Sequence, residues 1–187
     1  LEATRQAEEK FRTIYENSTD GIFQTTPEGQ YLSANPTLAS IYGYSSPEEL
    51  IANITDIAAQ LYVNPNRRDE FIAAMQTHEV VSQFESQVYR QDGSITWISE
   101  NARAVKDAKG KLLYYEGTVE DIAERKQTDA MLQASETKLR MQQTALMELS
   151  KCQPLYTGEL SAALREITET AAYTLGVERV SAWFYNQ

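Results

Sequence analysis

The chain has 187 residues, with 17 Lys and Arg against 27 Asp and Glu, and a formal net charge of −10. Nucleic acid and anionic membrane surfaces are therefore excluded as expected partners, because both attract proteins through clustered positive charge. The hydrophobic fraction of 42% is that of a globular protein with a packed core.

Cysteine usage and hydropathy indicate the compartment. The single cysteine, Cys152, rules out an internal disulfide framework and fits a reducing environment. No apolar stretch approaches the ~20 residues that span a bilayer, and the N-terminal sequence lacks a signal-peptide pattern. We therefore expect a cytoplasmic fragment that makes no membrane contact of its own.

The first predicted element is a helix over residues 1–16. Phe11, Ile14 and Tyr15 fall on one face of it at helical spacing, among charged residues. The polar segment 17–21, which contains Gly, ends this helix.

A hairpin and a capped helix follow. Strands are predicted over 22–25 and 31–34, joined by a turn over 26–29 that carries Pro and Gly. Asn35-Pro36 then begins a helix, because a capping side chain is followed by Pro at the first helical position.

Two further helices start with related signals. Ser46 and Glu49 have the spacing of a capping box, in which each residue satisfies a backbone N–H of the other. Asn64-Pro65 repeats the cap-and-proline pattern and is predicted to begin an amphipathic helix that ends near residues 77–78.

From residue 80 the hydrophobic period changes to two, which is typical of strands. Turns with Asp and Gly separate three strands, predicted over 80–90, 95–106 and 112–120. With the N-terminal hairpin they predict an α+β domain: a five-stranded antiparallel sheet with helices on one face, an N-terminal cap helix and a long C-terminal linker helix.

The last strand runs into this linker helix without a loop. Leu132, Leu139 and Leu146 are spaced seven apart along it, and Leu149 belongs to the companion position, which is otherwise polar. A marginal seam of this kind can hold two registers of similar energy, which suits signalling. The alternative is a connector helix that stays single and solvated.

The C-terminal part has the pattern of a second domain that is cut short. After a break at 153–158, an amphipathic helix is predicted over 159–175 and a strand over 177–185. One helix and one strand cannot close a hydrophobic core.

In their order, and in the turn and cap residues that separate them, these elements resemble a PAS domain of the bacterial sensor type, with its C-terminal PAC-like segment. The resemblance covers about residues 11–126. Ala123 replaces the Thr of the family's usual Asp-Ile-Thr exit. The resemblance implies a domain that senses a small ligand or a partner and relays the change through its C-terminal helix. The motifs that carry it are Ile14–Phe23, Tyr31–Pro36, Tyr42–Tyr44, Ser46–Leu50, Arg90–Ser94 before Trp97, and Asp121-Ile122 before Glu124–Lys126.

The tail from about Leu146 to Tyr185 resembles the start of a GAF domain. A PAS domain followed by a GAF domain resembles the sensory half of bacterial and cyanobacterial histidine kinases, and of cyclic-nucleotide or cyclic-di-nucleotide enzymes. We therefore expect a sensory and dimerisation module, a homodimer through its N-terminal and linker helices, with an output domain in the parent protein. The implied divisions are an N-terminal helix at 1–16, PAS at 17–122, linker at 123–152 and partial GAF at 153–187.

Signals for catalysis and cofactors are weak. The chain has no phosphate-binding loop, no His and Cys cluster and no nucleophile paired with a His, so we expect no enzyme activity and no tightly bound cofactor. His78 is interpreted as a favourable charge at a helix C-terminus, with an axial haem ligand as the alternative that the resemblance allows. Residues 53–56 lack the Cys of light-sensing flavin relatives, although a haem or flavin sensor stays the alternative function.

The resemblance also places one set of strand residues toward the interior, with Trp97 on the other face, where the N-terminal helix could cover it. One interpretation of the inward set is a small-ligand cavity with Glu100 as its polar anchor. The other is a packed core in which Glu100 pairs with Arg67, Arg68 or Tyr115, or reaches solvent at the sheet edge. The inward set is Phe84, Ser86, Val88, Ile98, Glu100, Ala102, Tyr115, Gly117 and Val119.

The strand-to-helix joint is the predicted route of the signal. Asp121, Ile122, Glu124 and Arg125 are its candidate residues. Asp121 and Arg125 are four apart and are expected to pair across one helical turn.

Overall fold

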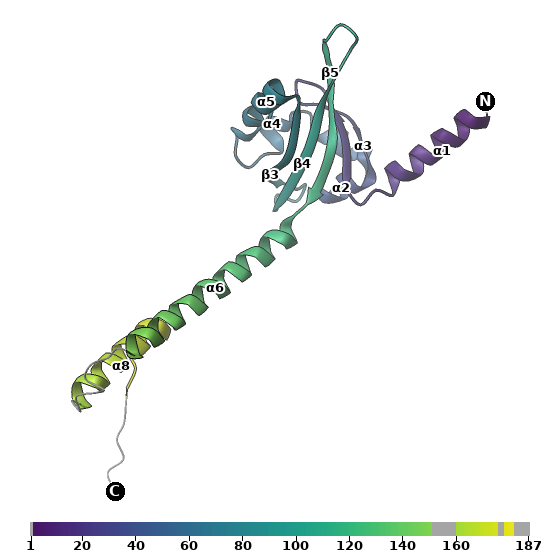
Figure 1. Cartoon of the computed structure of the whole chain (residues 1–187). Helices are drawn as coiled ribbons and strands as arrows, with labels where there is room; N and C mark the ends of the chain where they lie inside the picture. Colours follow the sequence, from purple (N-terminus) through teal and green to yellow (C-terminus); the bar gives the residue numbers. More distant parts are fainter. Residues whose placement is uncertain (1, 151–159, 176–177, 182–187) are drawn as a thin grey trace. The chain divides into compact units, whose positions relative to one another are not determined.

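The computed structural model describes residues 2–150, 160–175 and 178–181 (Figure 1). The chain forms two compact units, Leu1–Lys126 and Gln127–Gln187. Within the described ranges, no helix combines the length and the apolar character that a membrane crossing requires.

A five-stranded sheet in the order β2-β1-β5-β4-β3 organises the first unit. All neighbouring strands are antiparallel, so the predicted α+β class and sheet are confirmed. The predicted boundaries of the last three strands are met within one residue. The strands are β1 (Gly21–Thr25), β2 (Tyr31–Ala34), β3 (Val80–Tyr89), β4 (Ile95–Lys106) and β5 (Leu112–Asp121).

Four helices between β2 and β3 lie against one face of this sheet (Figure 1). The hydrophobic core forms between these helices and the sheet, with Leu38, Leu50, Phe71 and Val88 at most 1% exposed. A helix precedes the sheet and another follows it. The helices of this unit are α1 (Glu2–Glu16), α2 (Pro36–Ile41), α3 (Pro47–Asn53), α4 (Ile57–Gln60), α5 (Arg67–His78) and the first turn of α6 (Ala123–Ser150).

Asn35 explains why α2 starts where the sequence predicts. Its Oδ1 atom accepts the Leu38 N–H at 2.9 Å and the Ile22 N–H at 2.8 Å, so it caps the helix and holds β1. Its Nδ2 atom donates to the carbonyl oxygens of Tyr15 and Asp20, both at 3.0 Å. One buried amide therefore ties the end of α1, the start of β1 and the start of α2 together.

Of the two other predicted helix starts, the one at Ser46 is confirmed and the one at Asn64-Pro65 is wrong. Ser46 Oγ accepts the Glu49 N–H at 3.2 Å as expected, but the Glu49 carboxylate binds the Ser45 N–H, so only half of the capping box forms. The helix expected at Asn64-Pro65 begins at Arg67 instead. Asn64 Oδ1 accepts the N–H of residue 66 at 3.0 Å, so it forms a turn before the helix rather than a cap.

A β-bulge interrupts β3 near its start. The register with β4 shifts between Val81 and Phe84, and Gln83 has a φ of 52°. The Gln83 N–H donates to Asn101 Oδ1 at 2.9 Å. Because the bulge adds one residue, Val81 and Phe84 point to the same face of the sheet.

The second unit contains the rest of α6 and α8 (Leu160–Leu175). Leu132, Leu139 and Leu146 on α6 are 56–67% exposed. The predicted break at 153–158 lies outside the described residues, as does most of the strand predicted over 177–185. The part of that segment that is described, 178–181, has no regular secondary structure.

Candidate functional site

The inner face of the sheet brings together the nine residues that were predicted to point inward. Glu100 pairs in register with Phe84 on β3 and with Val119 on β5, and Ala102 pairs with Gly117. Eight of the nine are buried or packed against the core, with Phe84 and Gly117 the least enclosed. Their shared orientation follows from the strand period, while their role in binding stays a prediction.

Glu100 is the carboxylate at the centre of this face, and it is 5% exposed. Its Oε2 atom accepts a hydrogen bond from the Tyr62 hydroxyl at 2.8 Å. Burial raises the pKa of Glu100 to about 7, although the Tyr62 hydrogen bond and the nearby charges of Arg68 and Arg67 oppose that rise. Tyr62 lies between α4 and α5 and was missed, because nothing in its local sequence points to β4.

Further polar groups are buried in the same core. Tyr31 and Tyr42 are buried, and burial together with the charge of Glu100 raises the pKa of both hydroxyls. Arg68 is 7% exposed, and its guanidinium carbon lies 5.0 Å from the Phe71 ring centroid. Arg68 Nη2 and Thr25 Oγ1 are buried without a hydrogen-bond partner among the described residues. A small molecule with hydrogen-bonding groups would satisfy such atoms.

Arg67 connects α5 to the edge strand β3. Its Nε atom donates to Ser86 Oγ at 3.1 Å, and its Nη2 atom donates to the Glu85 carbonyl oxygen at 2.7 Å. The guanidinium carbon also lies 3.6 Å from the Phe84 ring centroid, within cation–π range. Two of the predicted inward residues are therefore held by Arg67.

Gly117, a member of the predicted inward set, lies where β5 comes very close to β4. A Cβ atom at this position would lie 2.1 Å from the Asn101 carbonyl oxygen on β4. Gly117 therefore permits the close approach of β5 to β4, and its part in a ligand pocket stays a prediction.

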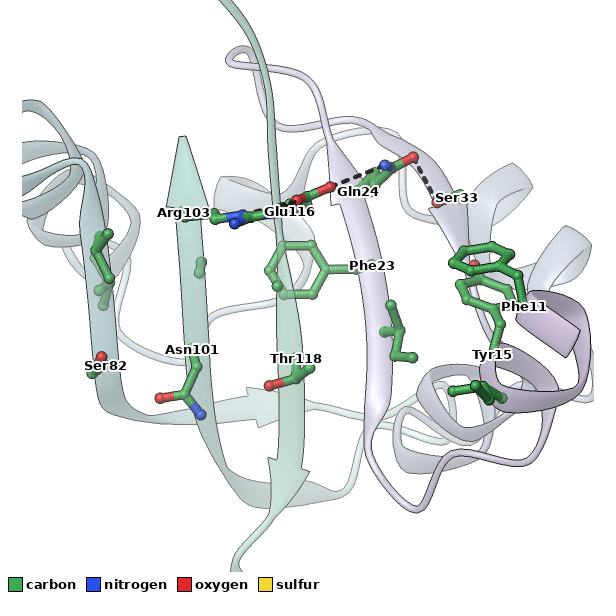
Figure 2. Close-up of a pocket in the computed structure, with 16 residues that line it drawn as sticks. Phe11, Tyr15, Phe23, Gln24, Ser33, Ser82, Asn101, Arg103, Glu116 and Thr118 are labelled. Carbon is green, nitrogen blue, oxygen red and sulfur yellow. Dashed lines mark hydrogen bonds and ion pairs between the residues drawn. The ribbon is translucent and has the colours of Figure 1, made fainter. Parts of the chain in front are cut away.

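The outer face of the sheet carries a groove of about 850 Å³ beside α1 (Figure 2). Phe11, Ile14 and Tyr15 line it from the helix, and Phe11 and Ile14 are 70% and 63% exposed. Ala102 and Gly117 are the members of the predicted inward set that border it.

A row of polar side chains crosses this groove from β2 to β4 (Figure 2). Ser33 Oγ donates to Gln24 Oε1 at 3.1 Å, and Gln24 Nε2 donates to Glu116 Oε2 at 3.3 Å. Arg103 completes the row, because its Nε and Nη2 atoms donate to Glu116 Oε1 at 2.9 and 2.6 Å. The groove therefore combines an apolar helix face with a hydrogen-bonded sheet surface.

At the joint, Asp121 is held by the β3–β4 hairpin. Arg90 Nη2 donates to its Oδ2 atom at 2.8 Å, and Thr96 Oγ1 donates to its Oδ1 atom at 3.2 Å. The Ala123 N–H also donates to Oδ1, at 2.9 Å, so Asp121 caps the start of α6. The expected pair with Arg125 is wrong, because Asp121 belongs to a strand and the four-residue spacing brings side chains together only within a helix.

Arg125 instead reaches Glu85 on β3, with Nη2 to Oε1 at 2.9 Å. Lys126 forms an ion pair with the other oxygen of the same carboxylate, and its ammonium lies 5.0 Å from the Trp97 ring centroid. The Lys126 hydrogen bond and both positive charges lower the pKa of Glu85. Trp97 is on the outer face of the sheet, as predicted. The side chain that lies over its ring is that of Lys126, and not a residue of α1.

The remaining joint residues lie in the first turn of α6 or just before it. Ile122 is 1% exposed, and its N–H donates to the Trp97 carbonyl oxygen at 2.9 Å. Glu124 is exposed. Sequence reasoning found Asp121, Ile122 and Arg125, but it missed the partners on β3 and β4 because they are distant in the chain.

The other candidates stay apart from these sites. His78 is exposed at the end of α5, so the structure does not bring the alternative haem ligand to the buried set. Within the described ranges, no group of three or more His, Cys, Asp and Glu residues is placed to hold a metal ion. Cys152 and the side chain of Leu149 lie outside the described residues.

Comparison with known proteins identifies one family and several relatives. The family model described as "PAS domain" matches residues 19–124. The chain is 26% identical over 129 residues to the probable diguanylate cyclase DgcE of Escherichia coli K12, covering 68% of this chain and 12% of that protein. It is 24% identical over 164 residues to the sensor histidine kinase TmoS of Ectopseudomonas mendocina, covering 86% of this chain and 15% of that protein.

Solved structures share the fold. The crystal structure of a PAS domain from Colwellia psychrerythraea aligns with a TM-score of 0.54 and 20% sequence identity. The alignment covers 63% of this chain and 98% of that one.

Proposed function

Because the chain belongs to the PAS domain family, we propose that it is the sensory and dimerisation module of a multidomain signalling protein, and specifically of a sensor histidine kinase. The similarity to TmoS supports a kinase output, and the similarity to DgcE supports the alternative of a cyclic-di-nucleotide enzyme. In this proposal the segment from 153 onward begins a GAF domain, and catalysis belongs to a domain beyond it.

One observation carries the proposal: a buried polar cluster and an output helix share the same sheet. Glu100 lies on the inner face of β4, while Ile122 alone separates β5 from α6. The first turn of α6 is bound to β3 by an ion-pair cluster at Glu85. A change in the core therefore has a short physical route to the helix.

We assign ligand sensing to the core around Glu100. Glu100 can receive a hydrogen bond from a donor, and Arg68 Nη2 can donate one to an acceptor. The expected ligand is therefore a small polar molecule with both kinds of group. The competing function is a dimer scaffold with a filled core, which the dense packing of Leu38, Phe71 and Ile98 favours.

We assign dimerisation to α1 and α6. Phe11 and Ile14 leave an apolar helix face uncovered beside the groove, and Leu132, Leu139 and Leu146 leave another on α6. Exposed apolar residues at this regular spacing are typical of a helix that pairs with a partner.

Native mass spectrometry of the whole chain tests these assignments together. We expect a dimer that retains a small polar molecule. A dimer of the bare chain mass would contradict ligand sensing and support the scaffold, and a monomer at all concentrations would contradict dimerisation. An absorbance spectrum addresses the cofactor alternative, because a visible band from haem or flavin would overturn the proposal of an uncoloured ligand.

A further inference from the structure

Glu85 contacts two separate elements through two different groups. Its backbone carbonyl accepts the Arg67 Nη2 hydrogen bond from α5 at 2.7 Å. Its carboxylate binds Arg125 at 2.9 Å and Lys126, both in the first turn of α6. The residue therefore stands between a helix of the core and the output helix.

We propose that Glu85 is the residue through which a movement of α5 changes the hold of the sheet on α6. The inference rests on the proposed function in one respect, that α6 is the output element. In this inference a movement in the core reaches α6 through the edge strand β3, as well as through the direct chain connection from β5 to α6.

The core end of this route is Arg67. It neighbours Arg68 in sequence, and its charge acts on the buried Glu100 carboxylate. Arg67 also holds Ser86 and stacks on Phe84, so it contacts three consecutive residues of β3. A ligand that displaces the N-terminal turn of α5 would therefore displace residues 84–86.

The position of β3 in the sheet favours such a movement. It is an edge strand, with β4 as its sheet neighbour, and the bulge at Gln83 lies two residues before Glu85. A bulged edge strand has fewer ladder hydrogen bonds to lose than a central strand. On its outer side β3 is bonded at residues 87–89, to residues 61–63. Displacement at Glu85, before that contact, is therefore easier than in β5, which has strand partners on both sides.

The output end of the route is electrostatic. The Glu85 side chain is 33% exposed, and its pKa is lowered by Lys126 and Arg125, so it stays ionised at neutral pH. Two cations on one carboxylate hold the base of α6 against β3, next to Trp97. A small displacement of Glu85 weakens both contacts because ion pairs depend on close approach.

Amide hydrogen exchange in the full chain tests this route. Glu85→Gln should raise the exchange rates of the α6 amides at 126–130 by about two- to fivefold, the range that a partly exposed ion pair supports. Arg67→Met should raise the same rates, although among the described contacts Arg67 reaches β3 and not α6. In the double variant the two effects should not add, because both act through Glu85.

The matched control is Arg103→Met, which removes a cation from the Glu116 ion pair on the outer face of the same sheet. It should leave the α6 amides unchanged. The rates are normalised to the central β4 amides, so that a general loss of stability does not count as transmission, and Arg67→Lys replaces Arg67→Met if the latter fails to fold.

Unchanged α6 exchange in the Arg67 variant, or full additivity with Glu85→Gln, would overturn the inference. This outcome is separable from a failure of the proposed function. Exchange coupling is a comparison between variants to which no ligand is added, whereas a retained ligand and the dimer are detected by native mass spectrometry.

Discussion

The Tyr62 hydroxyl donates a 2.8 Å hydrogen bond to Glu100, which places an ionisable carboxylate and its donor inside the core of the sheet domain. Burial raises the pKa of Glu100 to about 7, from an ordinary 4.5. The protonation state of this one group therefore changes near neutral pH, where most carboxylates stay ionised.

The first prediction concerns stability against pH. A raised pKa means that Glu100 is protonated to a greater extent in the folded chain than in the unfolded chain between pH 4.5 and about 7. The stabilising contribution of Glu100 to the free energy of unfolding is thus fully present below pH 4.5 and is lost as pH rises through 7. The loss is about 3 kcal/mol at most. Glu100→Gln should remove this fall, and urea unfolding at several pH values measures it. If the free energy of unfolding changed with pH in the same way in the wild type and in Glu100→Gln, the raised pKa of Glu100 would be contradicted.

The second prediction removes the donor. Tyr62→Phe should lower the free energy of unfolding at pH 8 by about 1–3 kcal/mol, because an ionised buried carboxylate loses its partner. At pH 5, where Glu100 is protonated, the loss should be smaller. Tyr114→Phe, on the opposite face of the sheet, is the control and should have little effect at either pH. An equal loss for Tyr62→Phe at both pH values would show that Glu100 is not the group involved.

The third prediction concerns the cap of α6. Asp121→Ala removes the acceptor of the Ala123 N–H and the partner of Arg90, so we expect a loss of about 1–2 kcal/mol and faster exchange in the first turn of α6. The sheet should stay intact by circular dichroism. Glu120→Ala, one residue earlier, is the matched control. Global unfolding of Asp121→Ala would mean that this residue supports the fold rather than the joint.

The fourth prediction distinguishes strand approach from ligand space at Gly117. Gly117→Ala places a Cβ atom 2.1 Å from the Asn101 carbonyl oxygen, so β4 and β5 must separate. We expect a loss of about 3 kcal/mol or more, against less than about 1 kcal/mol for Thr118→Ala at the next position. Thermal unfolding measures both. A neutral Gly117→Ala variant would instead support the interpretation of Gly117 as part of a ligand cavity.

The fifth prediction addresses the leucine seam. Leu139 is 56% exposed, so Leu139→Glu should leave the single chain folded while placing a charge in the proposed dimer seam. The dimer dissociation constant should rise at least about tenfold by analytical ultracentrifugation. Gln133→Glu, on the same helix but away from the leucine face, is the control for charge alone. An unchanged constant for Leu139→Glu would place the dimer contact elsewhere.

Local signals explain most of what could be predicted of the fold. Asn35-Pro36 marks the start of α2 because an Asn cap and a Pro at the first helical position act within four residues. The same pattern predicted a helix start at Asn64-Pro65, and this prediction was wrong because the Asn64 side chain forms a turn instead. Strand periods and Asp-Gly turns were enough to order the last three strands.

The candidate site was predicted less completely, because its contacts are long-range. The resemblance to the PAS family placed Glu100 inward, but its donor, Tyr62, is 38 residues away in a loop. Asp121 was recognised as a joint residue, yet its partner Arg90 is 31 residues away on the neighbouring hairpin. Pairings of this kind depend on the assembled sheet and have no signature in a single sequence.

The measurement that tests the central claim most directly is a distance between two labels in the dimer. Cys152 is the single cysteine, so a nitroxide can be attached there without other substitutions. Pulsed electron spin resonance on the wild-type chain at pH 5.5 and pH 8 compares protonated with ionised Glu100. We expect the distance distribution between the two Cys152 labels to shift with pH in the wild type and to stay constant in Glu100→Gln. A wild-type distribution that is the same at both pH values would contradict transmission from the core to α6.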